Sequence, residues 1–257
     1  MKKIAALITV LIFSTFSAVN VYASNSEISW YIKRAGQKRP QIGAEHFEIE
    51  NYGGYYIDKK VTDDSEHKVI YLTFDAGYDN GNVNKTVDIL KEKNVKAAFF
   101  ILDTIPLKNT ELLRRMFEDG HLVCNHTKNH KNISRMSKEE IINNLSDLER
   151  ICEEKCGQKM AKYFRFPEGR YSIDALKTVN ELGYKTVFWS FAYADWDNNR
   201  QPDKESAFRK IIDNTHNGEI ILLHPTSATN VEILPKLIDK WREMGYTFGT
   251  LDELVAE

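Results

Sequence analysis

Chemically capable side chains follow five apolar stretches of this chain, each at the point where the stretch ends. In chain order they are Asp75, His126 with His130, Arg165 with Glu168, Asp195 with Trp196, and His224. Carboxylates and imidazoles move protons near neutral pH, and imidazoles also bind divalent metals. The pattern therefore indicates one polar centre that combines acid–base chemistry with a metal.

Strands and helices are expected to alternate from Lys68 to the end of the chain. The predicted strands are Val69–Phe74, Ala97–Leu102, His121–Cys124, Tyr163–Phe166, Tyr184–Trp189, Glu219–Leu223 and Tyr246–Gly249. The predicted helices are Val83–Lys93, Asn109–Asp119, Ser137–Cys156, Ser172–Leu182, Asp203–Thr215 and Val231–Met244. This alternation predicts an α/β fold with a parallel sheet and outer helices, either closed as a distorted barrel or open. The carboxyl ends of parallel strands share one edge, so the polar residues should meet there.

Most of these residues also have a structural interpretation that the sequence leaves open. Asp75 is either a catalytic carboxylate or a cap for the following turn. His126 and His130 have i, i+4 spacing, so on a helical turn both rings would reach one metal, but surface histidines often show this spacing too. His224 is either a general acid or a core histidine. Arg165 needs a carboxylate partner at a buried strand end, and Asp75 is the natural candidate.

The whole chain has the composition of an ordinary globular protein. It has 257 residues, 42% of them hydrophobic and 28% charged, which is enough for one large domain. Its net charge of −2 does not favour nucleic acid as a partner. An odd number of cysteines, Cys124, Cys152 and Cys156, excludes a fully paired set within the chain.

The N-terminus has the pattern of a secretory signal peptide. A basic start at residues 1–3 is followed by an apolar run over residues 4–19 and by a small-x-small site that ends at Ala23. An uncleaved membrane anchor is the alternative. We expect a signal peptide over residues 1–23, an extension over 24–66 and the main domain over 67–257. The protein should then act outside the cytoplasm.

Five ordered motifs resemble those of the NodB-type polysaccharide deacetylases, carbohydrate esterase family four. They are Thr73-Phe-Asp-Ala-Gly77, His126-Thr-Lys-Asn-His130, Arg165-Phe-Pro-Glu-Gly169, Asp195-Trp196 and Leu222-Leu-His224. The resemblance covers about residues 68–257 and implies a deformed (β/α)7-type barrel with an N-terminal extension. The segments 73–81 and 188–196 are similar to the PdaA type of the family, which deacetylates peptidoglycan N-acetylmuramic acid and leads to muramic δ-lactam in spore cortex.

The resemblance also implies a role for each residue. Asp75 would be the base, His224 the acid, and Arg165 would orient Asp75. His126 and His130 would hold a divalent metal, expected to be zinc. The backbone N–H of Glu168 would stabilise the oxyanion. Asp195 would support His224, Trp196 would wall the pocket, and Leu222 would line the acetyl site.

Two positions depart from the family pattern. Ala76 stands where most members have a second aspartate that binds the metal, so another side chain, water or substrate would have to complete the site. Asp79 is near enough in sequence to help, but it can equally cap its loop. Glu168 replaces a frequent tyrosine, which leaves its side-chain role open.

The N-terminal pattern and the family resemblance together imply a secreted, monomeric hydrolase of amide bonds that acts on peptidoglycan glycan strands in the cell wall or spore cortex. We expect its substrate to be N-acetylmuramic acid whose stem peptides an amidase has removed. The alternatives are deacetylation of N-acetylglucosamine or of another glycan, and carbohydrate binding with little catalysis, which the Ala76 change keeps open.

Overall fold

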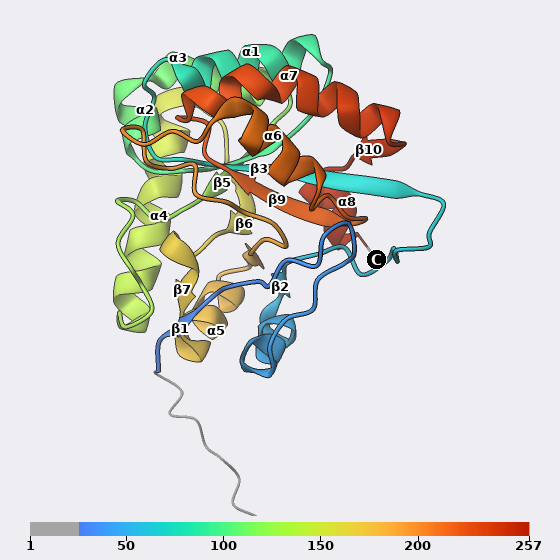
Figure 1. Cartoon of the computed structure of the whole chain (residues 1–257). Helices are drawn as coiled ribbons and strands as arrows, with labels where there is room; N and C mark the ends of the chain where they lie inside the picture. The colour runs from blue at the N-terminus through green and yellow to red at the C-terminus, as the bar shows by residue number, and fades with distance from the viewer. Residues whose placement is uncertain (1–25, 257) are drawn as a thin grey trace, which may run out of the picture.

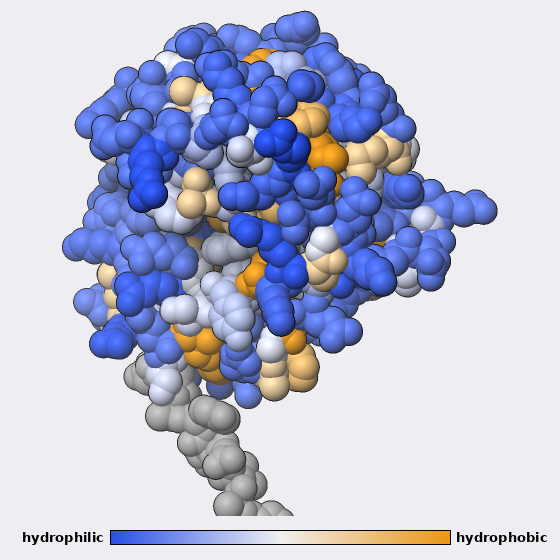
Figure 2. All heavy atoms as spheres, in the orientation of Figure 1, coloured by the Kyte–Doolittle hydropathy of each residue, from blue (hydrophilic) through white to orange (hydrophobic). Residues whose placement is uncertain are grey.

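The computed structural model describes residues 26–256. The predicted signal peptide lies outside these residues. Within residues 26–256, no helix is long and apolar enough to cross a bilayer. Polar and charged residues cover most of the face in Figure 2, and apolar residues form small separate patches on it.

One long strand organises the parallel sheet. The strand β3, Lys68–Ala76, pairs with β10 (Tyr246–Phe248), β9 (Glu219–Leu223) and β4 (Ala98–Ile101). The sheet continues from β4 through β5 (Leu122–Asn125), β6 (Ala161–Phe164) and β8 (Lys185–Val187) to β2 (Gly54–Tyr55). Residues 69–76 of β3 are all buried, as expected for a strand with side chains packed on both faces.

The sheet curls until its two sides meet. Just after β8, Phe191 forms a parallel bridge to Ile221 of β9, and its carbonyl accepts a hydrogen bond from the Leu222 N–H at 2.9 Å. A second bridge joins Ile57, just after β2, to Glu219. The curled parallel sheet confirms the predicted α/β fold of the deformed-barrel type. Its curvature brings the ends of β3 and β9 to the same rim as those of β5 and β6.

Helices cover the outside of the sheet. They are α1 (Asn82–Glu92), α2 (Thr104–Lys108), α3 (Thr110–Glu118), α4 (Lys138–Cys156), α5 (Ile173–Glu181), α6 (Lys204–Ile212), α7 (Ala228–Glu243) and α8 (Leu251–Val255). Figure 1 shows α1, α3 and α7 over one side and α4 beside β5 and β6. The main core lies between these helices and β3, whose Ile70, Leu72, Phe74 and Ala76 all belong to it.

Side-chain caps explain where several helices begin. Ser137 and Glu140 form the capping box that starts α4. Ser227 caps α7 by accepting from the Asn230 N–H, so this helix begins three residues before the predicted Val231. The earlier start places Pro235 inside the helix, where a proline has no N–H to donate.

Residues 26–66 add secondary structure that the sequence did not predict. The two-residue strand β1, Ile28–Ser29, pairs antiparallel with β7, Arg170–Tyr171. The 3₁₀ helix η1, Ala44–Tyr52, leads into β2, which pairs with β8. These residues pack against the domain that follows, and the domain boundary at residue 66 stays a prediction.

Candidate active site

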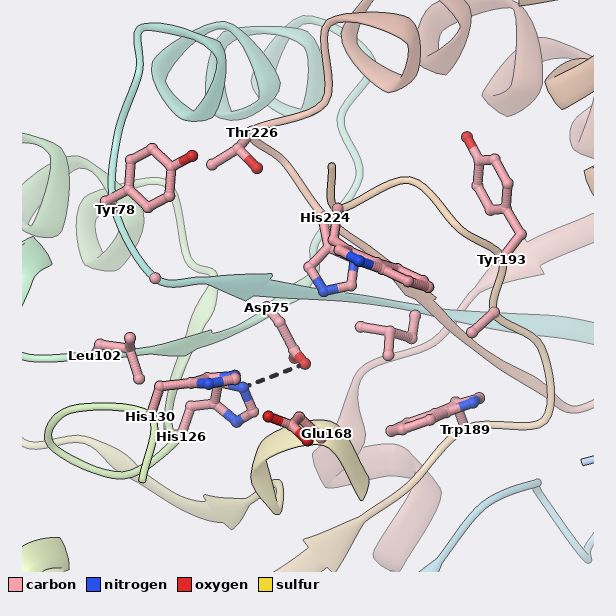
Figure 3. Close-up of a pocket in the computed structure, with 14 residues that line it drawn as sticks. Asp75, Tyr78, Leu102, His126, His130, Glu168, Trp189, Tyr193, His224 and Thr226 are labelled. Atoms are coloured by element: carbon pink, nitrogen blue, oxygen red, sulfur yellow. Dashed lines mark ion pairs between the residues drawn. The ribbon is translucent and has the colours of Figure 1, made fainter. Parts of the chain in front are cut away.

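The sequence-predicted residues meet around a pocket of about 680 Å³ at the carboxyl ends of the strands (Figure 3). Those that line it are Asp75, His126, His130, Glu168, Trp196, Leu222 and His224. Arg165 and Asp195 are buried, and each contacts a residue of the pocket wall. The nine residues therefore form one centre, as the shared edge of parallel strands predicts.

Asp75 is held by a fully buried arginine. It lies near the end of β3, and its Oδ1 accepts a hydrogen bond from Arg165 Nη1 at 2.8 Å. Arg165 follows β6, donates its Nε to the Val187 carbonyl at 2.9 Å, and lies over the Phe100 ring. Burial alone raises the pKa of the Asp75 carboxyl. The charge that His126 takes up in acid, the charges of Arg165 and His224, and the Arg165 hydrogen bond more than offset burial and hold this pKa below its usual value. Asp75 is therefore an ionised, oriented carboxylate.

His126 presents a lone pair to the pocket. Its Nδ1 lies 2.8 Å from the carbonyl of Arg165, a contact that requires the proton on Nδ1. Its Nε2 lies 3.4 Å from Asp75 Oδ2. Burial lowers the pKa of His126 to about 4, so the ring is neutral at pH 7. This is the protonation state and tautomer that a metal ligand requires.

The His130 ring lies beside that of His126 because of a loop conformation that the sequence did not predict. The two imidazole centroids lie 5.0 Å apart although residues 126–130 form an irregular loop and not the helical turn that i, i+4 spacing would use. Thr127 and His130 have φ values of 71° and 58°, in the left-handed region. The Thr127 N–H donates to Asn125 Oδ1 at 2.9 Å, which helps to hold this unusual backbone.

His224 is anchored by an acidic side chain behind it. It follows β9, and its Nδ1 lies 2.7 Å from Asp195 Oδ1. Asp195 Oδ2 accepts from the backbone N–H of His224 at 2.8 Å and from Asn230 Nδ2 at 2.6 Å. Burial lowers the pKa of His224, but the charge and hydrogen bond of Asp195 outweigh burial and raise this pKa above its usual value. The raised pKa favours the protonated ring, whose second proton lies on Nε2, the nitrogen that Asp195 leaves free.

Glu168 lies in a tight turn. The 3₁₀ helix η2, Pro167–Gly169, starts with a proline, so Glu168 carries the first N–H of the turn. Glu168 has a φ of 57°, and its side chain extends toward solvent, 3.4 Å from Arg170. The backbone N–H is thus the group of this residue that suits a role in the pocket.

Aromatic rings form much of the remaining wall. Trp196 is 61% exposed and its ring lies edge-on to His224, with 6.1 Å between the centroids. The sequence missed Tyr78, Trp189, Tyr193 and Thr226 as pocket residues. Trp189 and Tyr193 belong to the aromatic run 188–196, and this run was the feature of the sequence that could have identified them as pocket residues. Asn198 donates to the Tyr78 hydroxyl at 2.6 Å, and this hydrogen bond joins the loop after β3 to the loop after β8.

The side chains partly fit a divalent metal. His126 and His130 offer two nitrogens, but Ala76 is fully buried in the apolar core. Asp79 does not replace the missing carboxylate, because its oxygens accept from the Gly81 N–H at 2.8 Å and from Asn109 Nδ2 at 3.0 Å. Within residues 26–256, no group of three or more His, Cys, Asp or Glu side chains is placed to hold a metal. The donor set fits an ion that takes its other ligands from water or substrate.

The chain is similar to known proteins over nearly its whole length. A family model described as polysaccharide deacetylase matches residues 62–187. The peptidoglycan-N-acetylmuramic acid deacetylase PdaA of Bacillus subtilis is 34% identical over 91% of this chain and 88% of that protein. The solved structure of that protein, described as a family 4 carbohydrate esterase, aligns with a TM-score of 0.83 over 90% of this chain and 97% of the other. A peptidoglycan-N-acetylglucosamine deacetylase of Bacillus cereus is 31% identical over 74% of this chain and 90% of that protein.

Proposed function

This chain belongs to the polysaccharide deacetylase family, and we propose that it removes the N-acetyl group from N-acetylmuramic acid in peptidoglycan. Family membership confirms the resemblance predicted from the five motifs, and with it a hydrolase that acts on N-acetyl amide bonds. The choice of muramic acid is supported by the similarity to PdaA, which covers 91% of this chain.

The observation that carries the proposal is the pair Asp75 and His224, which face one pocket from the ends of neighbouring strands (Figure 3). Each is fixed by an oppositely charged partner, Asp75 by Arg165 and His224 by Asp195. One group is a carboxylate whose pKa is lowered and the other an imidazole whose pKa is raised, which favours the base and acid forms that general acid–base hydrolysis of an amide requires.

In the proposed mechanism, Asp75 takes a proton from a water molecule while the water oxygen attacks the acetamide carbonyl carbon. The backbone N–H of Glu168 donates to the oxyanion that forms. His224 Nε2 then gives its proton to the sugar nitrogen as the carbon–nitrogen bond breaks. The products are acetate and a free amine. Leu222, which is buried against this site, would contact the acetyl methyl group.

We propose zinc as the cofactor, with His126 and His130 as its protein ligands. Bound there, it would polarise the acetamide carbonyl and the water. Arg165 contributes to the site without touching the ion, because its backbone carbonyl keeps the His126 proton on Nδ1.

The proposed substrate is glycan without stem peptides. A muramic residue carries a lactyl group, and in intact wall this group bears the peptide. Closure of a δ-lactam needs a free lactyl carboxyl beside the new amine, so an amidase would have to act first. We further propose that the enzyme acts outside the cytoplasm, in the cell wall or the spore cortex, as a monomer whose signal peptide has been removed.

Acetate release from purified glycan tests the proposal. We expect release from peptidoglycan that an amidase has stripped, and much less from peptide-bearing glycan. Release only from polymers of N-acetylglucosamine would favour the second candidate, which the similarity to the Bacillus cereus enzyme supports. Glycan binding without release would indicate a carbohydrate-binding protein that has lost its activity.

A further inference from the structure

Two loops of the proposed active site are joined by a side chain from the N-terminal segment, far from the five family motifs in sequence. One loop carries His126 and His130 and continues into Asn132 and Ser134. The other is the turn of Glu168, which continues into β7 with Arg170. The side chain that contacts both is Glu27. This residue directly precedes β1, which lies beside β7 (Figure 1).

Glu27 makes its contacts with both carboxylate oxygens. Oε2 accepts from Asn132 Nδ2 at 2.6 Å and from Ser134 Oγ at 2.7 Å. Oε1 lies 2.7 Å from Arg170 Nη2 and accepts from Arg170 Nε at 3.0 Å. The Glu27 side chain is 12% exposed and that of Arg170 is 41% exposed, so the ion pair lies at the surface while the Glu27 carboxylate itself is mostly covered. The hydrogen bonds from Ser134 and Asn132 hold the pKa of Glu27 below its usual value, and the carboxylate is charged at neutral pH.

The residues after Glu27 extend the contact to the turn itself. Ile28 and Ser29 pair with Tyr171 and Arg170. The Trp30 N–H donates to the Gly169 carbonyl at 2.8 Å, and Trp30 Nε1 donates to the carbonyl of Trp189, a pocket residue, at 3.1 Å. Trp189 and Trp30 pack closely against the turn, because a Cβ atom added at Gly169 would lie 2.8 Å from Trp189 and 3.0 Å from Trp30.

We propose that Glu27 is a positioning residue that fixes the loop of His126 and His130 relative to the turn of Glu168. The proposal rests on the proposed function, since it assigns a role in catalysis to these two loops. Both contain non-glycine residues with left-handed backbone, at Thr127, His130 and Glu168, so both need outside contacts to keep their shape. The hydrogen bond from Ser172 Oγ to the Ser134 carbonyl, 2.6 Å, joins the same two segments and should limit the effect of losing Glu27.

The test compares Glu27→Ala with Glu50→Ala, a change in the same N-terminal region that removes only an exposed ion pair with Lys59. Because small misplacements of catalytic groups reduce turnover steeply, we expect Glu27→Ala to lower kcat about tenfold. Substrate binding should be little affected, so KM should stay within about twofold of wild type. Glu50→Ala should match wild type in both constants. Glu27→Gln keeps an oxygen for Asn132 and Ser134 but loses the charge that Arg170 pairs with, so its kcat should lie between.

Hydrogen exchange provides a readout that does not need activity. In Glu27→Ala we expect faster exchange in peptides covering 126–136 and 165–172 together, with the midpoint of urea unfolding equal to that of Glu50→Ala. Wild-type kcat in Glu27→Ala, faster exchange in only one loop or in neither, or a fall in kcat that follows a fall in the unfolding midpoint would overturn the proposal. If wild-type protein releases no acetate from any glycan, the proposed function fails, and the exchange result alone decides whether Glu27 couples the loops.

Discussion

The buried pair of Asp75 and Arg165 allows a quantitative prediction. Arg165 is fully buried, Asp75 is 9% exposed, and 2.8 Å separates Arg165 Nη1 from Asp75 Oδ1. Arg165→Met would leave the carboxylate buried beside an apolar side chain. Removing one partner of such a pair typically costs about 3–5 kcal/mol in the free energy of unfolding. Asp75→Asn would leave the guanidinium with the carbonyls of Val187 and Phe188 but without a counter-charge, so we expect a cost near the lower end, about 3 kcal/mol.

The double variant Asp75→Asn with Arg165→Met removes both charges. Because neither is left uncompensated, its cost should fall short of the sum of the single costs by about 3 kcal/mol. Urea unfolding of the four proteins measures this coupling, and acetate release should be low in all three variants. The reasoning is refuted if the costs add to within about 0.5 kcal/mol, the value expected for independent sites.

Three further predictions concern the acid, the base and the metal. Asp75→Asn and His224→Ala should each lower kcat by about 10²- to 10⁴-fold, the usual range for acid–base groups, and near wild-type acetate release from either would remove its assignment. Asp195 raises the pKa of His224, and the acid is active only when protonated, so activity is lost as pH rises through this pKa. Asp195→Asn should therefore move the alkaline limb of kcat/KM to lower pH, and an unmoved limb would show that His224 is not the acid. With two imidazoles and the apolar Ala76, the metal should be easily lost to chelator and restored by added zinc. Full activity in metal-free protein would contradict the proposed cofactor.

Much of the fold was predictable because periodicity reports burial directly. The seven predicted strands all belong to the parallel sheet, since apolar runs between helical patterns leave few alternatives. The two-residue strands β1, β2 and β7 were missed because they are too short to have a pattern. The start of α7 was predicted three residues late because the cap at Ser227, and not the apolar spacing, sets it.

The site was predictable where its residues follow strands, and less so where loop backbone decides the geometry. The parallel ends of β3 and β9 bring Asp75 and His224 to one rim whatever the loops do. In contrast, His126 and His130 meet through left-handed backbone at Thr127 and His130, which depends on contacts that spacing does not reveal. Glu27 was missed for a related reason, because its partners lie more than 100 residues away.

The most direct test of muramic acid deacetylation is mass spectrometry. Amidase-treated peptidoglycan is incubated with the enzyme, and the glycan is then digested and analysed. Mass spectrometry locates the free amine on one of the two sugars of the repeat. We expect loss of acetyl from muramic residues, with glucosamine left acetylated, and no loss with Asp75→Asn. Acetyl loss confined to glucosamine, or equal loss from peptide-bearing glycan, would contradict this expectation.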